Sequence, residues 1–335
     1  MLISVCMVAF NEEKTLSGIL SDITAQSYPH SDTELLLIDN NSTDKTYDIL
    51  CRFRDEHISE YHDIIILQNT TSVLSAGLNR GLDVYTGDVF VRIDAHASLS
   101  VDFIEETVAC LEGTHTGIRE YVCGGMRPTY TPNSDGMSQM LRSAEESHFG
   151  ASAASYRGTP ARCYVDTAFH AAYRREVIDC VGKYDERLWR TEDNNYNWRV
   201  RQAGYRICFE PRIKSRQQIR SSLSKMLSQK YSNGYWIGYT LGVSPECLSL
   251  FHFVPCAFVL ASIACLALSF FGLGIFGALM WGLYALCSVI FSIKAIINAK
   301  HPHLHYLLLP LVFFLMHVCY GTGTIVGIFK LLCRK

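Results

Sequence analysis

Four short apolar runs, each followed by polar residues, dominate the first hundred positions of the chain. They cover Leu2 to Phe10, Glu34 to Ile38, Asp63 to Leu67 and Gly87 to Asp94. The first run is too short to span a bilayer and nearly continuous, which predicts a parallel strand buried on both faces. Apolar residues recur at helical spacing in the stretches between the runs, over residues 16–23, 47–53 and 75–84. This alternation predicts an α/β domain with a mostly parallel sheet wound with helices.

Polar residues close three of the four predicted strands. Asn11 follows the first strand, Asp39 the second, and Asp94 ends the fourth. Ligands of such sheets bind at the carboxyl ends of the strands, so we expect these three side chains at one binding edge. Asn11 is also predicted to cap the first helix, with Glu12 and Glu13 in its first turn, where the helix dipole favours negative charge.

The fourth strand ends in Asp94-Ala95-His96. Side chains at positions i and i+2 of an extended segment point the same way, so a carboxylate and an imidazole would lie side by side. That pair suits Mn²⁺ or a similar divalent cation, which commonly holds a diphosphate. Taken alone, the triplet fits a strand end with a solvated aspartate and a chance histidine better than a metal site.

Composition narrows the class of protein. Lys plus Arg is 30 and Asp plus Glu is 32 in 335 residues, so no nucleic-acid partner is indicated. No Gly-x-Gly-x-x-Gly follows the first strand and no Walker A sequence occurs, which argues against the common dinucleotide and P-loop sites. The 13 cysteines include no Cys-x-x-Cys pair and are expected to be reduced. Met1 runs into a strand without a basic leader, so no signal peptide is expected.

Two later segments bear on the site. The stretch from Gly150 to Arg162 is rich in Ala, Ser and Gly, and we expect a mobile segment over the site. Glu192 and Asp193 open a helical stretch that turns basic before Gly204. Acidic residues at a helix start fit the helix dipole without any chemistry, so the pattern alone assigns them no role.

The amino-acid composition changes in the carboxyl-terminal third of the chain. Residues 211–245 hold six basic residues and no acidic one, with Tyr235 and Trp236 near the end. We expect a basic amphipathic helix over Ile219 to Tyr231, with its linker, in a membrane interface, the alternative being an ordinary surface helix. No charged residue occurs between Glu246 and Lys294. Because one span needs roughly 20 residues, three spans are predicted over residues 248–271, 275–293 and 306–329.

The predicted topology contains a conflict. Three spans place the amino-terminal domain and the chain's end on opposite sides, which puts the basic tail outside against the positive-inside tendency. A re-entrant segment would remove the conflict.

His252 and His317 lie within these spans and either have a function or pack against a neighbouring helix. The predicted domains are therefore 1–210, 211–245 and 246–335.

Seven stretches in order resemble family-2 glycosyltransferases of the GT-A fold, a Rossmann-like architecture. They are SVCMVAFNEE, LLLIDNNSTDKT, SAGLNRGL, VRIDAHA, GGMRP, FHAAYRREVIDCVGKYDERL and TEDNNYNWRVRQAGYRI. They cover roughly residues 2 to 240 and are most similar to the branch of succinoglycan and other exopolysaccharide glucosyltransferases. The apolar tail agrees with that branch.

The resemblance implies roles for individual residues. Asp39 matches the acidic residue that contacts the nucleotide base, and Asp94 with His96 matches the Asp-x-Asp metal motif. Asp193 matches the acidic residue that acts as general base. The resemblance further implies a nucleotide-sugar site formed by residues of the matching stretches: Ala9, Asn11, Glu12, Asp39, Asn79 and Asp94. Mn²⁺ or Mg²⁺ is the implied cofactor.

The chain departs from the family pattern at two places. Asn-Asn-Ser-Thr-Asp follows Asp39 where many members have Asp-Gly-Ser-Thr-Asp, which affects the contacts to base and ribose. The Gln-x-x-Arg-Trp motif of processive synthases is absent, since Gln229 is followed by Lys-Tyr-Ser-Asn-Gly. We therefore expect addition of one sugar rather than polymer extrusion.

The expected protein is an inverting hexosyltransferase of the inner, cytoplasmic membrane with its catalytic domain in the cytoplasm. It would use a nucleotide sugar such as a UDP-hexose in exopolysaccharide or capsule biosynthesis. Its expected acceptor is a polyprenyl-diphosphate-linked sugar, approached through Arg216, Arg220 and Trp236 next to membrane lipids. A soluble sugar acceptor is the alternative.

Two other classes of protein compete with this hypothesis. A catalytically inactive membrane-anchored nucleotide-sugar-binding or scaffold protein predicts decay at the chemical positions, whereas Asp39, Asp94, His96 and Asp193 are all present. A transporter or flippase predicts spans with buried polar residues in a repeat-like order, and three spans behind a large soluble domain are few for one.

Overall fold

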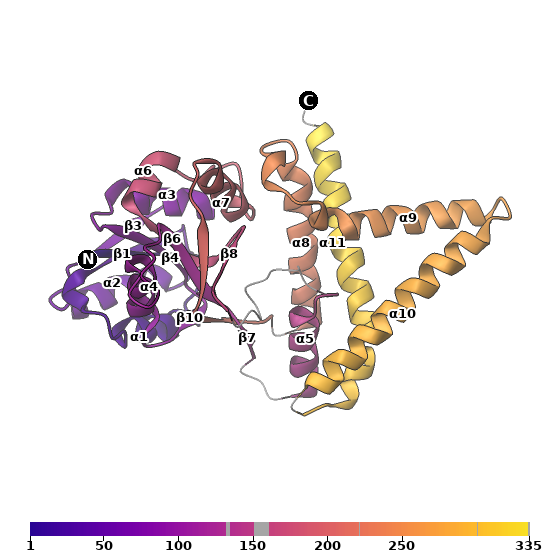
Figure 1. The fold of residues 1–335 in the computed structure, drawn as a ribbon, viewed down its shortest axis with the longest axis horizontal. Coiled ribbons are helices and arrows are strands. Elements are labelled where there is room, and N and C mark those ends of the chain that lie inside the picture. Colours follow the sequence, from indigo (N-terminus) through magenta and orange to yellow (C-terminus); the bar gives the residue numbers. More distant parts are fainter. Residues whose placement is uncertain (132–134, 151–160, 221, 300, 334–335) are drawn as a thin grey trace. The chain divides into compact units, whose positions relative to one another are not determined.

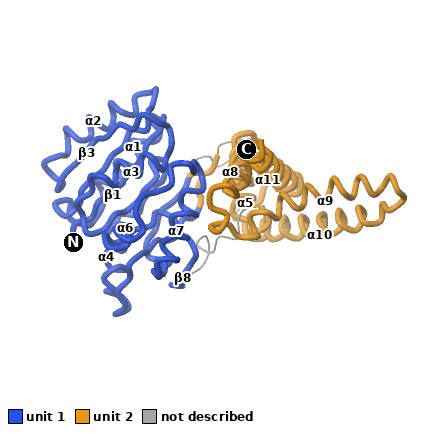
Figure 2. Tube along the Cα trace, turned by 90° about the horizontal axis from the view of Figure 1, so that it is seen from above, with its two compact units in different colours: residues 1–128, 155–217 blue, residues 129–154, 218–335 orange. Residues whose placement is uncertain are grey.

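The computed structural model describes residues 1–131, 135–150, 161–220, 222–299 and 301–333. The described chain forms two compact units, residues 1–128 with 155–217 and residues 129–154 with 218–335 (Figure 2). Most of the stretch predicted to move over the site, residues 151–160, lies outside the described residues.

The first unit is a mixed sheet covered by helices (Figure 1). Its strands run in the order β3-β2-β1-β4-β9-β6-β10-β5, with β8 beside β10. The strands are β1 Ile3–Ala9, β2 Thr33–Asp39, β3 Asp63–Gln68, β4 Val89–Asp94, β5 Ala97–Leu99, β6 Val122–Met126, β7 Thr129–Tyr130, β8 Cys163–Val165, β9 Phe169–Arg174 and β10 Ile207–Gln218. The helices of this unit are α1 Leu16–Thr24, α2 Thr46–His57, α3 Leu74–Val84, α4 Phe103–Glu112, α6 Arg175–Val181 and α7 Glu192–Gln202.

The four strands predicted from the apolar runs form the parallel half of the sheet. β3, β2, β1 and β4 pair in parallel, whereas β9 pairs antiparallel with both β4 and β6. Every residue of β2 is buried, as expected for a strand covered on both faces. The helical spacing in the first helix is also confirmed, since Leu16, Ile19, Leu20 and Ile23 are all buried.

The first helix begins later than predicted. α1 starts at Leu16, and Asn11 has a φ of 54°, in the left-handed region that asparagine tolerates better than most residues. The Asn11 Oδ1 accepts a hydrogen bond from the backbone N–H of Thr43 at 2.8 Å instead of capping α1. The prediction of Asn11 as an N-cap is therefore wrong, because its side chain joins the loop after β2.

The second unit is a helical assembly. Its helices are α5 Gly136–Glu146, α8 Leu223–Thr240, α9 Val254–Ser269, α10 Gly274–Asn298 and α11 Leu309–Leu332. Three helical segments are long and apolar enough to cross a membrane: Leu250–Ser269, Gly274–Asn298 and Leu304–Leu332. Apolar side chains cover the outside of the first two segments. Only 11% of the apolar window of the first segment, and 6% of that of the second, is buried.

Glycines allow α8 and α11 to pack closely. A Cβ at Gly238 would lie 2.3 Å from the carbonyl oxygen of Thr324, and one at Gly323 would lie 2.2 Å from that of Tyr231. No side chain larger than hydrogen fits at such distances, so the two backbones touch directly. The buried Lys230 of α8 also pairs with Glu145 of α5 at 2.9 Å.

The basic stretch of residues 211–245 is divided between two elements, β10 and α8. Arg212, Lys214 and Arg216 lie in β10, where exposed residues alternate with the buried Ile213 and Ser215. The expected boundary at residue 210 thus falls inside a strand. α8 begins later, with the Ser222 side chain accepting a hydrogen bond from the Lys225 N–H. An interfacial position for α8 stays a prediction.

Candidate active site

The sheet brings the ends of three predicted site strands together. β1 lies between β2 and β4, with Ala9 in register with Asp39 and Val8 in register with Asp94. Parallel strands end at the same edge, so both carboxylates flank the end of β1. Asp39 is buried at 2% exposure, and its carboxylate faces the Ser42 N–H at 3.4 Å.

The loops that follow β1 and β2 are tied together. The Asn11 N–H donates to Ser42 Oγ at 3.0 Å, and the Glu12 N–H donates to Thr46 Oγ1 at 2.8 Å. Asn11 and Glu12 thus shape the wall next to Asp39. This is the place where the sequence predicted contacts to a nucleotide.

Glu12 also reaches the predicted metal motif. Its Oε1 lies 3.2 Å from Nδ1 of His96, at the turn after β4. A carboxylate on one ring nitrogen fixes the orientation and tautomer of a metal-ligating histidine, with the other nitrogen as ligand. Within the described residues no group of three or more His, Cys, Asp and Glu side chains is placed to hold a metal ion. A cation held by Asp94 and His96 would have to take further oxygen ligands from a bound diphosphate and water, and its binding here stays a prediction.

Two buried side chains face Asp94 from the sheet. Arg92 Nη2 lies 3.6 Å from Asp94 Oδ1, and His170 Nε2 accepts a hydrogen bond from the Asp94 N–H at 3.2 Å. Burial raises the pKa of the Asp94 carboxyl, but the surrounding positive groups, Arg92 first among them, together outweigh this effect and the pKa falls to about 2. Asp94 is thus ionised at neutral pH, as a metal ligand must be.

His170 has an unusual backbone. Its φ is 47°, which is rare for a residue other than glycine, and its Nδ1 is buried with no hydrogen-bond partner among the described residues. Burial lowers the pKa of its imidazole to about 3, so the ring is neutral at physiological pH. A neutral Nε2 can accept the Asp94 N–H, which fixes the end of β4.

The same arginine connects β4 to the predicted base. Arg92 Nη2 lies 3.1 Å from Oε1 of Glu192, which opens α7 immediately before Asp193. Burial raises the pKa of the Glu192 carboxyl, the Arg92 charge lowers it, and the net change is upward. The Asp193 Oδ1 accepts the Asn194 N–H at 2.8 Å. Through Arg92, the start of α7 is joined to the strand that carries Asp94.

Asn79 has a different environment from the other predicted nucleotide-sugar residues. Its amide donates to the Tyr184 carbonyl at 3.0 Å and to Glu186 at 2.8 Å, and accepts the Tyr184 N–H at 2.8 Å. These contacts anchor the segment before α7 to α3. A contact between Asn79 and a nucleotide sugar remains a prediction, and its structural role was not foreseen.

The predicted acceptor-side residues lie in both units. Arg216 is exposed on β10 and pairs in register with Ser98 of β5, two residues beyond His96. Arg220 is exposed between β10 and α8. Trp236 lies on α8, with its ring 5.5 Å from that of Tyr235 and 5.2 Å from that of Tyr239.

Sequence analysis missed Arg92, Glu192, His170 and Arg127 as members of the site. Arg127 stacks 3.7 Å from the Phe169 ring centroid and donates to Gln217 at 2.5 Å. One signal was present, because Arg92 is the charged residue inside an otherwise apolar strand. No local pattern identifies its partners, which come from elsewhere in the sequence.

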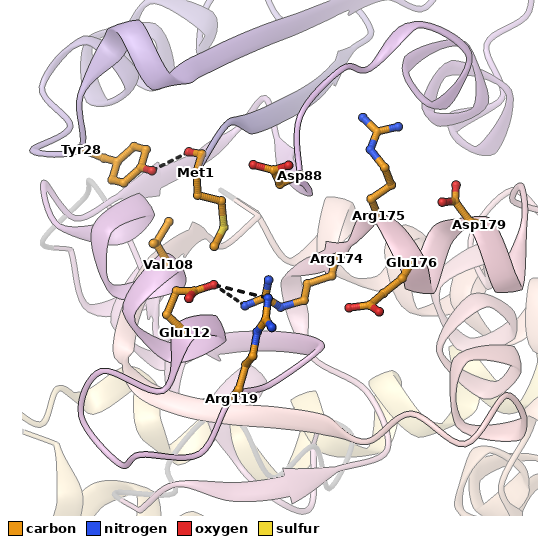
Figure 3. Close-up of a pocket in the computed structure, with 10 residues that line it drawn as sticks. All are labelled: Met1, Tyr28, Asp88, Val108, Glu112, Arg119, Arg174, Arg175, Glu176 and Asp179. Carbon is orange, nitrogen blue, oxygen red and sulfur yellow. Dashed lines mark hydrogen bonds and ion pairs between the residues drawn. The ribbon is translucent and has the colours of Figure 1, made fainter.

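A separate cavity of about 640 Å³ opens at the other end of the strands (Figure 3). Met1 and Asp88, which precede β1 and β4, line it together with Glu112 and Arg174. Arg174 is buried and donates to Glu112 at 2.5 Å. The cavity contains none of the predicted site residues.

Comparison with known proteins supplies the family. Residues 4–182 match glycosyl transferase family 2. The chain is 26% identical over 335 residues to dolichyl N-acetyl-α-D-glucosaminyl phosphate 3-β-D-2,3-diacetamido-2,3-dideoxy-β-D-glucuronosyltransferase of Methanococcus voltae, covering 98% of this chain and 97% of that protein. It is 26% identical over 199 residues to the succinoglycan biosynthesis protein ExoA of Rhizobium meliloti (strain 1021), covering 59% of this chain and 57% of that one.

A solved structure supports the fold. The mannosyltransferase PcManGT of Pyrobaculum calidifontis, in complex with GDP-Man and Mn²⁺, superposes with a TM-score of 0.59 at 15% identity. The superposition covers 99% of this chain and 87% of that one. At this identity the likeness concerns the fold, and it confirms the GT-A architecture expected from the sequence. Since the family match spans more than half of the 335 residues, the chain belongs to glycosyl transferase family 2.

Proposed function

We propose that this glycosyltransferase adds one hexose from a UDP-sugar to a lipid-linked oligosaccharide at the cytoplasmic face of the inner membrane, in exopolysaccharide or capsule biosynthesis. The observation that carries the proposal is the meeting of Asp39 and Asp94 on either side of β1. The ion pair from Arg92 to the start of α7 adds the residue next to Asp193 to this arrangement.

The donor would bind along the carboxyl edge of the sheet. Asp39, buried beside the tied loops of Asn11 and Glu12, would accept hydrogen bonds from the nucleoside. Buried acceptors of this kind discriminate strongly against ligands that lack the matching donor. The Asn-Asn-Ser sequence after Asp39 then contributes to the choice of base.

Asp94 and His96 would hold a divalent cation against the diphosphate of the donor. When bound, such a cation neutralises the charge that grows on the leaving diphosphate. The chain's own contribution is to keep Asp94 ionised through Arg92 and to orient the His96 ring through Glu12.

Asp193 would accept the proton of the acceptor hydroxyl, because a neutral hydroxyl is a poor nucleophile. Attack on the anomeric carbon as the diphosphate leaves is a single displacement, which inverts the configuration at that carbon. The absence of a Gln-x-x-Arg-Trp motif supports transfer of one sugar per acceptor.

Two observations support a lipid-linked acceptor. The name of the Methanococcus voltae relative, which matches over nearly the whole chain, describes a dolichyl-phosphate-linked sugar. Three helical segments of this chain are long and apolar enough to cross a membrane. An acceptor on a polyprenyl phosphate or diphosphate would share the bilayer with the enzyme.

The test uses the full chain purified in detergent with Mn²⁺, a panel of nucleotide sugars and a polyprenyl-linked monosaccharide. Release of nucleoside diphosphate that depends on one donor and on the acceptor is expected. Tight binding of a donor without release or transfer under any combination would instead favour a membrane-anchored nucleotide-sugar-binding scaffold.

A further inference from the structure

Arg92 is an unusual residue for its place in the fold. It lies in β4 opposite Cys6 of β1, in the middle of the sheet, and its side chain is only 14% exposed. A charge in such a place is costly unless it is paired and hydrogen-bonded. Arg92 has two carboxylates near one nitrogen, Glu192 at 3.1 Å and Asp94 at 3.6 Å.

The two carboxylates belong to different parts of the proposed reaction. Asp94 lies on the diphosphate side, whereas Glu192 opens the helix whose second residue is Asp193. The Glu192 side chain is 4% exposed, and its Oε2 has no hydrogen-bond partner among the described residues. Arg92 is thus a cation that holds the buried Glu192 carboxylate and the partly buried Asp94 carboxylate near each other despite their repulsion.

A purely structural ion pair is the competing explanation. The segment before α7 already has other anchors, since Asn79 bonds Tyr184 and the Ser75 Oγ donates to the Leu188 carbonyl at 3.1 Å. These anchors fix the helix to α3 and do not involve Asp94. The Arg92 contacts differ because they lead directly to a predicted ligand of the diphosphate-bound cation.

We propose that Arg92 is a positioning residue that couples Asp94 to the start of α7, so that binding of the metal–diphosphate group sets the position of Asp193. This inference rests on the proposed function for the roles of Asp94 and Asp193. The coupling itself depends only on the contacts of Arg92 with Asp94 and Glu192. A misplacement of about 1 Å between reacting groups costs roughly 10²-fold in rate, so a loose α7 would lower kcat.

The test compares Arg92→Met, the double variant Arg92→Met/Glu192→Met, and Arg92→Lys in the full chain. Arg92→Met leaves Glu192 buried without its cation and is expected to lower the thermal unfolding temperature. The double variant removes both charges and should restore most of that temperature. If the double variant does not fold, Glu192→Gln, which removes the charge that Arg92 pairs with at the start of α7, replaces it.

Three quantities are measured on each folded variant: kcat, affinity for Mn²⁺-UDP, and hydrogen exchange of the amides of residues 192–196 with and without Mn²⁺-UDP. In the wild type, binding should slow exchange at the start of α7. In the double variant, affinity should stay within about threefold while the slowing disappears and kcat falls roughly 10²-fold. Arg92→Lys, which keeps the charge, should recover at least about tenfold of that loss in kcat.

Arg174→Met is the matched control. Arg174 is also a buried strand arginine paired with a glutamate, but it lies at the opposite edge of the sheet. It should lower the unfolding temperature and leave kcat of the folded protein unchanged. A double variant with wild-type kcat and wild-type slowing of exchange overturns the coupling and leaves the proposed function intact. If the wild type transfers no sugar, but ligand slows exchange at α7 only when Arg92 is present, the proposed function fails and the coupling stands.

Discussion

The Asp193 carboxylate has one chemical task in the proposed reaction, which is to remove a proton from the acceptor. Asp193→Asn keeps the size of the side chain but cannot take that proton. We expect kcat to fall about 10²–10⁴-fold with unchanged affinity for the nucleotide sugar, because donor binding does not require the base. Steady-state transfer and calorimetric titration of the donor measure the two effects.

Asp166→Asn is the matched control, since Asp166 is 86% exposed and pairs with Arg201 at the surface. It should have wild-type activity. Residual transfer by Asp193→Asn within tenfold of the wild type would remove Asp193 from the role of base.

His96 supplies the second residue-level prediction. His96→Ala removes one of two predicted protein ligands and should weaken Mn²⁺-dependent binding of UDP at least about tenfold. Excess EDTA should stop turnover of the wild type. His115→Ala, which breaks a surface pair between His115 and Glu106 at 3.0 Å, should change neither quantity.

The metal assignment has a clear counter-result. Wild-type turnover in excess EDTA, by protein that contains no metal after purification, would contradict it. If His96→Ala and the wild type bind UDP with equal affinity at every Mn²⁺ concentration, His96 is not a metal ligand.

Individual residues also show how far sequence can predict the site. Asp39 and Asp94 were predicted to share an edge because each follows an apolar strand, and the structure confirms that position. Arg92 and His170 were not identified, because their importance comes from contacts with Glu192 and Asp94 far away in the sequence. A charged residue within an apolar strand can be noticed in the sequence, but the sequence does not show which distant residue it pairs with.

Among the secondary-structure elements, β10 shows where pattern analysis failed. Arg212, Lys214 and Arg216 alternate with the buried Ile213 and Ser215, which is the period of a strand with one buried face. Their shared positive charge grouped them with the basic helix predicted over Ile219 to Tyr231, a range that α8, Leu223–Thr240, overlaps. The antiparallel strands β8 and β9 were also missed, since the chain between the glycine-rich stretch and α7 lacks a long apolar run.

The packing of α8 on α11 gives an element-level prediction. Gly238→Ala places a methyl group where the nearest backbone oxygen lies 2.3 Å away, so the helices must separate. Overpacking of this kind typically costs about 1–3 kcal/mol. Thermal unfolding in detergent should show a lower midpoint for Gly238→Ala.

Gly282 of α10 is the matched glycine, because nothing lies within 4 Å of a Cβ built there. Gly282→Ala should leave the midpoint unchanged or raise it slightly, since alanine favours helix. An unchanged midpoint for Gly238→Ala would mean that α8 and α11 do not pack as described.

At the scale of the whole molecule, we expect three exposed cations, in β10 and between β10 and the body of α8, to raise the rate of transfer to a lipid-borne acceptor. Neutralising Arg216, Arg220 and Lys225 in the full chain removes attraction worth about 1 kcal/mol per charge near an anionic surface. We expect transfer to a polyprenyl-linked acceptor in anionic vesicles to fall by one to two orders of magnitude, roughly as three such charges imply. Truncation near Pro245 is a poorer test, because α8 would lose α11.

A control triple variant neutralises Arg52, Arg80 and Lys183, which are exposed elsewhere in the catalytic unit. It should transfer at the wild-type rate. If both triple variants are equally active in vesicles, Arg216, Arg220 and Lys225 have no part in acceptor use, and a soluble sugar becomes the better candidate.

The most direct test of the whole account is transfer of labelled sugar into lipid by the full chain reconstituted in vesicles. The vesicles contain a polyprenyl-phosphate-linked sugar, and UDP-[¹⁴C]hexose and Mn²⁺ are added outside. We expect one sugar added per acceptor with inverted anomeric configuration, and transfer by Asp193→Asn that is slower by about 10²–10⁴-fold. Label that enters only water-soluble sugars, or a lipid product that Asp193→Asn forms at the wild-type rate, would contradict it.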